Sequence, residues 1–505
     1  MGNIAPCNDK AESRMFEFLG IGTPALITLG LALALALAFE FVNGFHDTAN
    51  AVATVIYTNT LKPGPAVVWS GTWNFIGVLT SSGAVAFGIV ALLPVELVLN
   101  VGSGAGFAMI FALLLSAIIW NLGTWYMGLP ASSSHTLIGS IVGVGLMNSY
   151  LSADSAFGDG VNWAKLADTG KALLISPMIG FAGAALLLLL MRAVIRNKAL
   201  FEAPKGDVPP PWPVRLLLIA TCTGVSFAHG SNDGQKGMGL IMLIVIGAAP
   251  VAFALNQNAK PETLQHIEQQ ATTVQGALAG TAAQPSAEDA RKIVTLYLRK
   301  KQFDDTTLLA LGALNGELAH RLGGIKSLNE VAPDQRSSVR SDLYLISESL
   351  TRLDKAKQLP PAIDKSLLSS YGKDVKSLTS YIPIWVKIAV ALALGLGTMI
   401  GWKRIVVTVG ERIGKAHLNY GQGASAELVA FATIEAADVL GLPVSTTHVL
   451  SSGIAGTMVA NGGGLQKSTV RNILLAWVLT LPVCVLLGAG LFAAGLFLVF
   501  RVFGV

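Results

Sequence analysis

Long stretches without any charged residue constrain this chain more than any other feature of its sequence. Asp, Glu, Lys and Arg are all missing from six intervals: 18–39, 63–95, 97–153, 172–191, 237–259 and 472–500. A helix of about 20 apolar residues crosses the hydrocarbon of a bilayer, so the interval 97–153 is long enough for two crossings. A soluble core does not need runs of this length. We therefore expect a multi-pass protein embedded in a lipid bilayer.

Charged residues gather instead in the stretch 256–382. It holds 16 of the 35 Lys and Arg residues and 14 of the 30 acids, and its apolar residues recur at helical spacing. We expect a small soluble helical domain here. The three cysteines are scattered, which argues against a disulfide framework or a zinc site. No sequence feature points to a resident metal, a cofactor or a nucleic-acid partner.

The rest of the chain contains an internal repeat. Residues 128–143 are GLPASSSHTLIGSIVG and residues 441–456 are GLPVSTTHVLSSGIAG, with eight of the sixteen positions identical. A shorter pair precedes each of these, NGFHDTAN at 43–50 and HGSNDGQK at 229–236. The interval from the short element to the long one is 127 residues longer in the second half, which is the length of 256–382. The soluble stretch is therefore predicted to be an insertion into an otherwise matching second copy.

This organisation predicts an all-α membrane protein of two inverted five-segment repeats, with broken helices at the midplane and a small helical soluble insertion. An odd number of crossings in each copy would invert the second copy relative to the first. Loop charge agrees, because 94–105 has no Lys or Arg whereas the equivalent loop has Lys403, Arg404, Arg412 and Lys415. The expected segments are 20–58, 66–93, 106–127, 131–150, 172–195, 214–255, 383–402, 421–440, 444–460 and 470–500, the first and sixth of them interrupted.

Five parts of the chain follow from this scheme. They are a first transmembrane repeat (1–195), a basic cytoplasmic linker (196–213), the start of the second repeat (214–255), the soluble insertion (256–382) and the remainder of the second repeat (383–505).

The two Gly-Leu-Pro elements predict an anion site. Proline favours a helix start, and the hydroxyls that follow would lie beside the free N–H groups and positive dipole end of that helix. These hydroxyls belong to Ser132, Ser133, Ser134, Ser445, Thr446 and Thr447. The alternative is that they only cap a helix or join helices. His135 and His448 follow them and are either packed ring systems or members of a proton relay.

Acids inside apolar segments are the second class of candidate. Asp47 and Asp233 occupy equivalent positions, and an acid in a membrane segment is a functional candidate unless it lies at a wet helix end. We expect the helices to break at Gly44 and Gly230, exposing carbonyls that could hold a cation together with the carboxylates. Glu427 is a third, unduplicated acid. Glu40, Glu435 and Asp438 are expected near helix ends.

An acid beside an anion favours phosphate over sulfate. Phosphate keeps one or two protons at neutral pH and can donate them to a carboxylate, whereas sulfate would leave that carboxylate without a donor. A cation on the acid would reduce the repulsion and couple its own gradient to transport. The second short element has Lys236 where the first has Asn50, and this lysine could contact the anion or take the place of a cation.

These paired elements resemble the inorganic phosphate transporter (Pit) family through both halves of the chain. The match is most similar to the bacterial low-affinity members, on NGFHDTANAVATVIY at 43–57, on NDGQKG at 232–237 and on the soluble insertion. The resemblance implies a secondary symporter of the bacterial inner membrane, and it also implies a homodimer. It further implies that phosphate is bound by Asp47, Asn50, Asn232, Asp233 and the hydroxyl clusters. Glu427 matches the family's membrane glutamate.

The coupling ion separates the branches of that family. His46 and Lys236 stand where sodium-coupled members have Asn, which favours proton symport of phosphate as a neutral complex with a divalent metal. The residues expected to serve the coupling ion are Asp47, Asp233, Glu427, His46, His135 and His448. Sodium symport and a permease for sulfate or another oxyanion are the alternatives. An intramembrane enzyme has no supporting Ser–His–Asp order or metal-ligand set, so we expect a transporter rather than an enzyme or a receptor.

Overall fold

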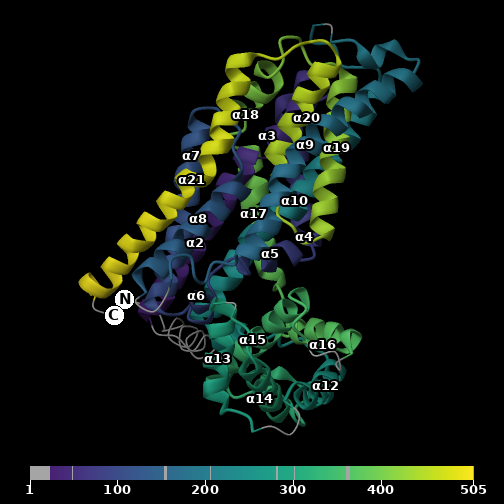
Figure 1. Ribbon diagram of the computed structural model, residues 1–505. Coiled ribbons are helices and arrows are strands. Elements are labelled where there is room, and N and C mark those ends of the chain that lie inside the picture. The colour runs from purple at the N-terminus through teal and green to yellow at the C-terminus, as the bar shows by residue number, and fades with distance from the viewer. Residues whose placement is uncertain are drawn as a thin grey trace, which may run out of the picture.

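The computed structural model describes residues 23–47, 49–152, 156–204, 206–279, 283–300, 302–359 and 364–503. Within these ranges the secondary structure is helical, and the β-structure found there is one isolated bridge between Gly414 and Leu465. The all-α prediction is therefore confirmed for this part of the chain. Long helices form a bundle, and shorter helices form a separate body below it (Figure 1).

The first half of the chain forms eight of the described helices. They are α2 (Thr23–Asp47), α3 (Ala49–Tyr57), α4 (Pro63–Thr80), α5 (Ala84–Val90), α6 (Val95–Leu99), α7 (Gly104–Tyr126), α8 (Ser133–Leu151) and α9 (Trp163–Val194). The second half begins with α10 (Trp212–Ala248) and α11 (Pro250–Phe253) and ends with α17 (Ile384–Met399), α18 (Lys403–Val407), α19 (Tyr420–Val439), α20 (Thr446–Ala460) and α21 (Lys467–Phe497).

Not every predicted segment is a membrane span by length and composition. Among the described residues five helical stretches qualify, and up to seven if each bent pair counts as one span; the bent pairs are α4 with α5, at 75°, and α17 with α18, at 55°. The others, α8, α19 and α20, begin in polar sequence and are largely buried between their neighbours. They pack against the apolar helices, α8 on α21 and both α19 and α20 on α9.

The expected helix breaks at Gly44 and Gly230 are wrong. α10 runs without interruption for 37 residues, and Gly44 lies inside α2. Both glycines serve close helix packing instead, because an added Cβ would lie 2.3 Å from the Leu394 carbonyl oxygen at Gly44 and 2.2 Å from the Asn74 carbonyl oxygen at Gly230. Small residues at such crossings let membrane helices approach closely.

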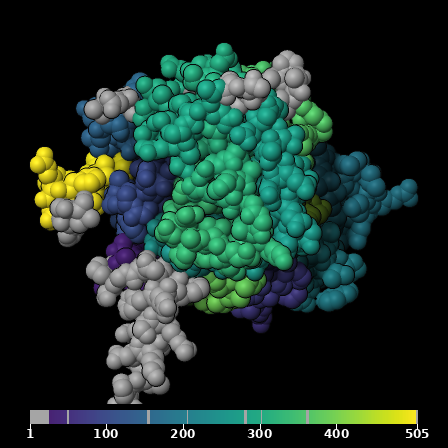
Figure 2. Space-filling view, turned by 90° about the horizontal axis from the view of Figure 1, so that it is seen from below, coloured from purple at the N-terminus to yellow at the C-terminus, as the bar shows by residue number. Residues whose placement is uncertain are grey.

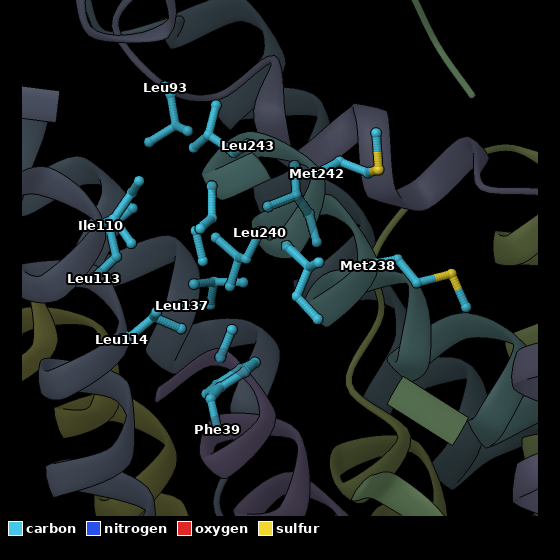
Figure 3. Close-up of a cluster of buried hydrophobic side chains, with 14 of the residues drawn as sticks. Phe39, Leu93, Ile110, Leu113, Leu114, Leu137, Met238, Leu240, Met242 and Leu243 are labelled. Carbon is cyan, nitrogen blue, oxygen red and sulfur yellow. The ribbon is translucent and has the colours of Figure 1, made fainter. Parts of the chain in front are cut away.

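One apolar core holds the centre of the bundle together. Phe39 of α2, Leu113 of α7, Leu137 of α8 and Leu240 of α10 point into the same cluster (Figure 3). α2 and α10 come from the two halves, so this core joins them directly. Inside a bilayer such a core is stabilised mainly by close van der Waals packing between helices, because the surrounding lipid is as apolar as the side chains.

The stretch that the sequence predicts to be an insertion forms its own helical body. Its helices are α12 (Pro261–Ala279), α13 (Ala287–Lys300), α14 (Asp305–Leu322), α15 (Arg336–Lys355) and α16 (Lys365–Ser377). They enclose a separate apolar core that also takes in Ala254 and Leu255 at the end of the membrane region. Seen from below, this body covers the middle of one face of the bundle (Figure 2). The chain leaves and returns at one point, since the Asn256 N–H donates to the Leu378 carbonyl at 2.8 Å.

Candidate functional site

Two buried carboxylates, one from each half of the chain, meet inside the bundle. Asp47 ends α2 and is 3% exposed, while Asp233 lies in the middle of α10 and is fully buried. The Ser133 hydroxyl donates to Asp47 Oδ2 at 2.6 Å and lies 3.4 Å from Asp233 Oδ2. Ser133 is the first residue of α8. A hydroxyl from one helix start therefore bridges the two acids.

Lys236 places a buried positive charge in the same cluster. Its ammonium lies 2.7 Å from Asp233 Oδ2, one turn earlier on α10, and donates to Ser133 Oγ at 3.1 Å. Neither side chain of the pair is exposed. Removing either partner of such a pair would leave an uncompensated charge away from water. The ion pair therefore fixes a cation beside the bridging hydroxyl.

The helix starts after the two Gly-Leu-Pro elements divide their hydroxyls between capping and the acids. Ser132 Oγ accepts the His135 backbone N–H at 3.3 Å, and Ser445 Oγ accepts that of His448 at 3.1 Å. Both serines are N-caps, which agrees with the alternative expectation that these hydroxyls cap a helix. Thr447 differs, since its hydroxyl donates to Asp47 Oδ1 at 2.6 Å.

The hydroxyls that reach Asp47 are not equivalent in the repeat. Ser133 corresponds to Thr446, and Thr447 corresponds to Ser134. Ser134 donates to the Val444 carbonyl at 2.7 Å, and the buried Thr446 hydroxyl has no hydrogen-bond partner among the described residues. The two copies therefore contribute different positions to the same carboxylate.

Of the two asparagines predicted from the short elements, the structure describes the side chain of Asn232. Asn232 donates to the Leu442 carbonyl at 3.2 Å, and its buried Oδ1 has no partner within the described ranges. Asn50 belongs to α3, but its side chain lies outside the described part of the structure. The amide of Asn232 thus ties α10 to the second Gly-Leu-Pro loop and leaves an acceptor available inside the cluster.

Three histidines predicted from the sequence surround these groups. His46 bridges Asp47 Oδ1 and Thr124 Oγ1, with both distances 3.1 Å. The rings of His135 and His448 lie side by side with centroids 4.5 Å apart, and His448 also stacks on Trp477 at 3.9 Å. His46 is therefore in direct contact with an acid, whereas the other two form a stacked aromatic column.

Glu427 forms a separate polar contact. It is fully buried in α19 and accepts hydrogen bonds from the hydroxyls of Thr54 and Thr221. These two hydroxyls differ from those of Ser133 and Thr447, which donate to Asp47.

Sequence reasoning missed His229 as a member of the site. Its Nε2 lies 3.4 Å from Asp233 Oδ2, and its Nδ1 lies 2.6 Å from Asn74 Oδ1. Asp47, His229 and Asp233 each offer a ligand atom, and these atoms lie within 4.8 Å of one another. Two carboxylates and an imidazole form a ligand set for a divalent cation. The available signal was the spacing, because His229 precedes Asp233 by four residues and so shares its helix face.

Glu40 was expected near a helix end, and this is wrong. It lies almost two turns before the end of α2 and is fully buried. A Cβ added at Gly237 would lie 2.5 Å from Glu40 Oε1, so the glycine makes room for this acid. Asp438, by contrast, does lie at the end of α19, where it accepts from Ser231 Oγ at 2.8 Å and from Gln235 Nε2 at 2.5 Å.

Comparison with known proteins matches most of the chain. The family model described as "Phosphate transporter family" covers residues 43–488. The low-affinity inorganic phosphate transporter PitA of Escherichia coli (strain K12) is 43% identical, over 95% of this chain and 98% of its own. A probable low-affinity inorganic phosphate transporter of Bacillus subtilis (strain 168) is 29% identical, over 90% of this chain and 92% of its own.

A solved structure gives the same fold. The sodium-dependent phosphate transporter has a TM-score of 0.50 and 19% identity, and the match covers 93% of this chain and 98% of the other. The apolar helices and the family match together make this a multi-pass membrane transport protein and not an enzyme. The chain belongs to the phosphate transporter family.

Proposed function

We propose that the protein imports inorganic phosphate by cation symport, with the anion bound where the two halves of the chain meet. The observation that carries this is the convergence of Ser133, Thr447 and Lys236 on Asp47 and Asp233. Donors from α8, α20 and α10 point at one small region, and each can turn from a carboxylate to a bound oxyanion.

The two acids favour phosphate over sulfate. A protonated phosphate oxygen can donate to Asp47 or Asp233, which replaces the hydroxyl donors that now satisfy these carboxylates. Sulfate has no proton to offer, and a buried acceptor without a donor costs about 1–3 kcal/mol. That difference corresponds to roughly 5- to 150-fold in affinity.

A neutral complex of phosphate with a divalent metal is the cargo that suits the cluster best. Two carboxylates against one lysine leave a net negative site, which repels a bare anion. The Asp47, His229 and Asp233 ligand set could hold the metal of such a complex while the hydroxyls bind its phosphate. The metal is then part of the substrate and travels with it.

Protons are the favoured coupling ion, and sodium is the alternative. The Lys236 ammonium lies against Asp233, where a sodium ion would otherwise neutralise that carboxylate. Glu427, with its two hydroxyl partners, and His46, beside Asp47, are the groups we assign to proton coupling. We assign His135 and His448 to the proton relay as well, because the buried His135 Nδ1 and His448 Nε2 have no hydrogen-bond partner among the described residues.

We also propose that the two halves are inverted repeats with the insertion as a separate domain, over the residue ranges predicted from the sequence. Helix packing supports this, because pairs recur with the halves exchanged: α4 on α10 and α17 on α2, α8 on α21 and α20 on α9. Each Gly-Leu-Pro loop lies against a bend of the other half. Thr408 donates to the Gly128 carbonyl at 2.7 Å, and Gly441 packs against Ala84.

The orientation we propose puts the junction between the halves in the cytoplasm of a bacterium, with the protein in its inner membrane. Basic side chains on that face are held there by neighbouring loops, as Arg215 is by the Thr60 carbonyl and Arg404 by the Tyr126 carbonyl. Cytoplasmic loops are enriched in such residues. α10 begins at this face and leads to the insertion, which then faces outward (Figure 1).

Radiolabelled phosphate uptake into proteoliposomes tests the function. Gradients of pH, sodium and magnesium are imposed one at a time, with sulfate as competitor. We expect uptake driven by a pH gradient and increased by magnesium, and no uptake by Asp47→Asn or Asp233→Asn protein that inserts normally. Full uptake by either variant would remove the proposed role of the acids. Uptake driven by the sodium gradient alone would make sodium the coupling ion in place of the proton. Cross-linking in membranes tests the proposed homodimer.

A further inference from the structure

A cavity of about 750 Å³ lies between the insertion and the membrane helices, and the central acids are not part of its lining. Its outer wall comes from α13, α15 and α16 of the insertion, and its inner wall from α5, α9, α10 and the loop at Gly441. Beside the cavity, salt bridges of 3.6 Å between Arg299 and Glu96 of α6 and of 3.9 Å between Lys355 and Asp168 of α9 connect the insertion with the membrane helices.

The charge of the lining is strongly positive. Arg340, Arg352 and Lys355 line the cavity from one face of α15, which Tyr344 and Glu348 complete at helical spacing. α16 and α9 add Lys376 and Lys165. Glu348 is the acid in this lining. The opposite face of α15, with Leu343 and Leu350, is buried in the core of the insertion. The basic face is thus directed at the cavity by the packing of the helix.

Arg340 is the group that points to a ligand. It is only 7% exposed, and among the described residues its Nε has no hydrogen-bond partner and no acid pairs with it. Burial lowers the pKa of Arg340 to about 10, so the guanidinium keeps its charge at neutral pH. A buried charge without a partner is unfavourable for folding, and a planar guanidinium is the preferred partner of phosphate groups.

Two residues in the lining of the cavity are chain neighbours of residues that contact the central site. Gly441 lines it, and the next residue, Leu442, accepts the hydrogen bond of Asn232. Ala84 lines it as well, and the N–H of the following Val85 donates to Gln235 Oε1 at 2.9 Å, next to Lys236. The chain pairs Ala84–Val85 and Gly441–Leu442 therefore connect the lining of the cavity with α10 next to the central acids.

We propose that this cavity is a second binding site for a phosphate group, centred on Arg340 and built by the insertion over the outer mouth of the transport path. The inference rests on the function and orientation proposed above. The phosphate group belongs either to free inorganic phosphate, held before it passes to the central acids, or to the headgroup of an anionic lipid at the membrane boundary.

Equilibrium binding of radiolabelled inorganic phosphate to the purified full-length protein tests the proposal. With free phosphate as occupant, we expect two sites in the wild type, one in Arg340→Gln and one in Asp233→Asn. Arg340→Gln should keep its maximal uptake rate while its KM rises roughly 10-fold, the loss expected for one charged hydrogen bond. Without phosphate, its melting temperature should equal or exceed that of the wild type, because a buried unpaired charge is gone.

Two further arms make the outcome decisive. Lys292→Gln removes the same charge from an exposed position of the insertion and should leave binding and KM unchanged. In nanodiscs, a melting temperature that rises with phosphatidylglycerol over phosphatidylcholine in the wild type, but not in Arg340→Gln, assigns the site to a lipid headgroup. If neither phosphate nor phosphatidylglycerol distinguishes Arg340→Gln from the wild type, the proposal is overturned. Transport by Asp233→Asn would instead reject the central site and leave this one standing.

Discussion

The buried ion pair between Lys236 and Asp233 allows a quantitative test of the site. Lys236→Gln would leave Asp233 inside the bundle without its cation, at a position with no solvent exposure and a 2.7 Å pair distance. Breaking a buried pair in this way costs about 3–5 kcal/mol. Ser133 also loses a donor at 3.1 Å, so the bridge between the acids is weakened as well.

The assay is unfolding of the purified protein by sodium dodecyl sulfate in mixed micelles, followed by tryptophan fluorescence. Lys236→Gln should reduce the free energy of unfolding by about 3–5 kcal/mol. Lys292→Gln is the matched control, since Lys292 pairs with Glu288 at 2.8 Å but both side chains are mostly exposed. Surface pairs contribute little, so this variant should unfold as the wild type does.

A double variant separates charge from packing. Asp233→Asn with Lys236→Gln removes both charges, and it should recover most of the lost stability, because a buried pair is often replaceable by neutral groups. It should still take up no phosphate. If Lys236→Gln is no less stable than Lys292→Gln, the two residues are not a buried charge pair and the electrostatic account of the site fails.

Three other substitutions have defined outcomes. Thr447→Val removes a 2.6 Å hydrogen bond to a carboxylate and should raise the KM for phosphate at least 10-fold in vesicle uptake, whereas Thr457→Val on the same helix should leave it unchanged. Gly230→Ala places a Cβ 2.2 Å from a carbonyl oxygen and should destabilise by about 1–3 kcal/mol or prevent assembly, while Gly372→Ala, in open space, should stabilise slightly in thermal melts. Asp304 caps α14, because its Oδ1 accepts the Thr307 N–H at 3.0 Å. Asp304→Ala should therefore lower the free energy of unfolding by roughly 1 kcal/mol at pH 7. The hydroxyl of Thr306 holds the pKa of Asp304 below its ordinary value of 3.8, so this difference from the wild type should disappear as pH falls below that value.

The sequence predicts membrane character and the insertion because both follow from composition along the chain. Charge-free runs can be counted, and the 127-residue offset locates the insertion without any structure. The prediction that the helix breaks at Gly230 came from local propensity and is wrong. The glycine is needed there because it packs against the carbonyl of Asn74 on another helix. Contacts of that kind depend on the packing of distant segments and leave no local pattern.

The candidate site, too, could be predicted only in part from the sequence. Asp47 and Asp233 stand out in the sequence as acids in apolar surroundings, and the structure brings them to a common hydroxyl. Which hydroxyls reach them could not be predicted, since repeat symmetry suggests equivalent positions while Ser133 and Thr447 are not equivalent. Symmetry in the chain is broken by the different neighbours, Lys236 and His46, that surround each acid.

The 2.8 Å hydrogen bond from the Asn256 N–H to the Leu378 carbonyl has a practical consequence for engineering. Because the polypeptide departs and re-enters at adjacent points, a short Gly-Ser linker could replace everything between them without changing the register of any transmembrane helix. The same junction could accept a fluorescent reporter or an affinity domain. Evolution could likewise exchange the helical body between these two points while the transmembrane helices stay unchanged.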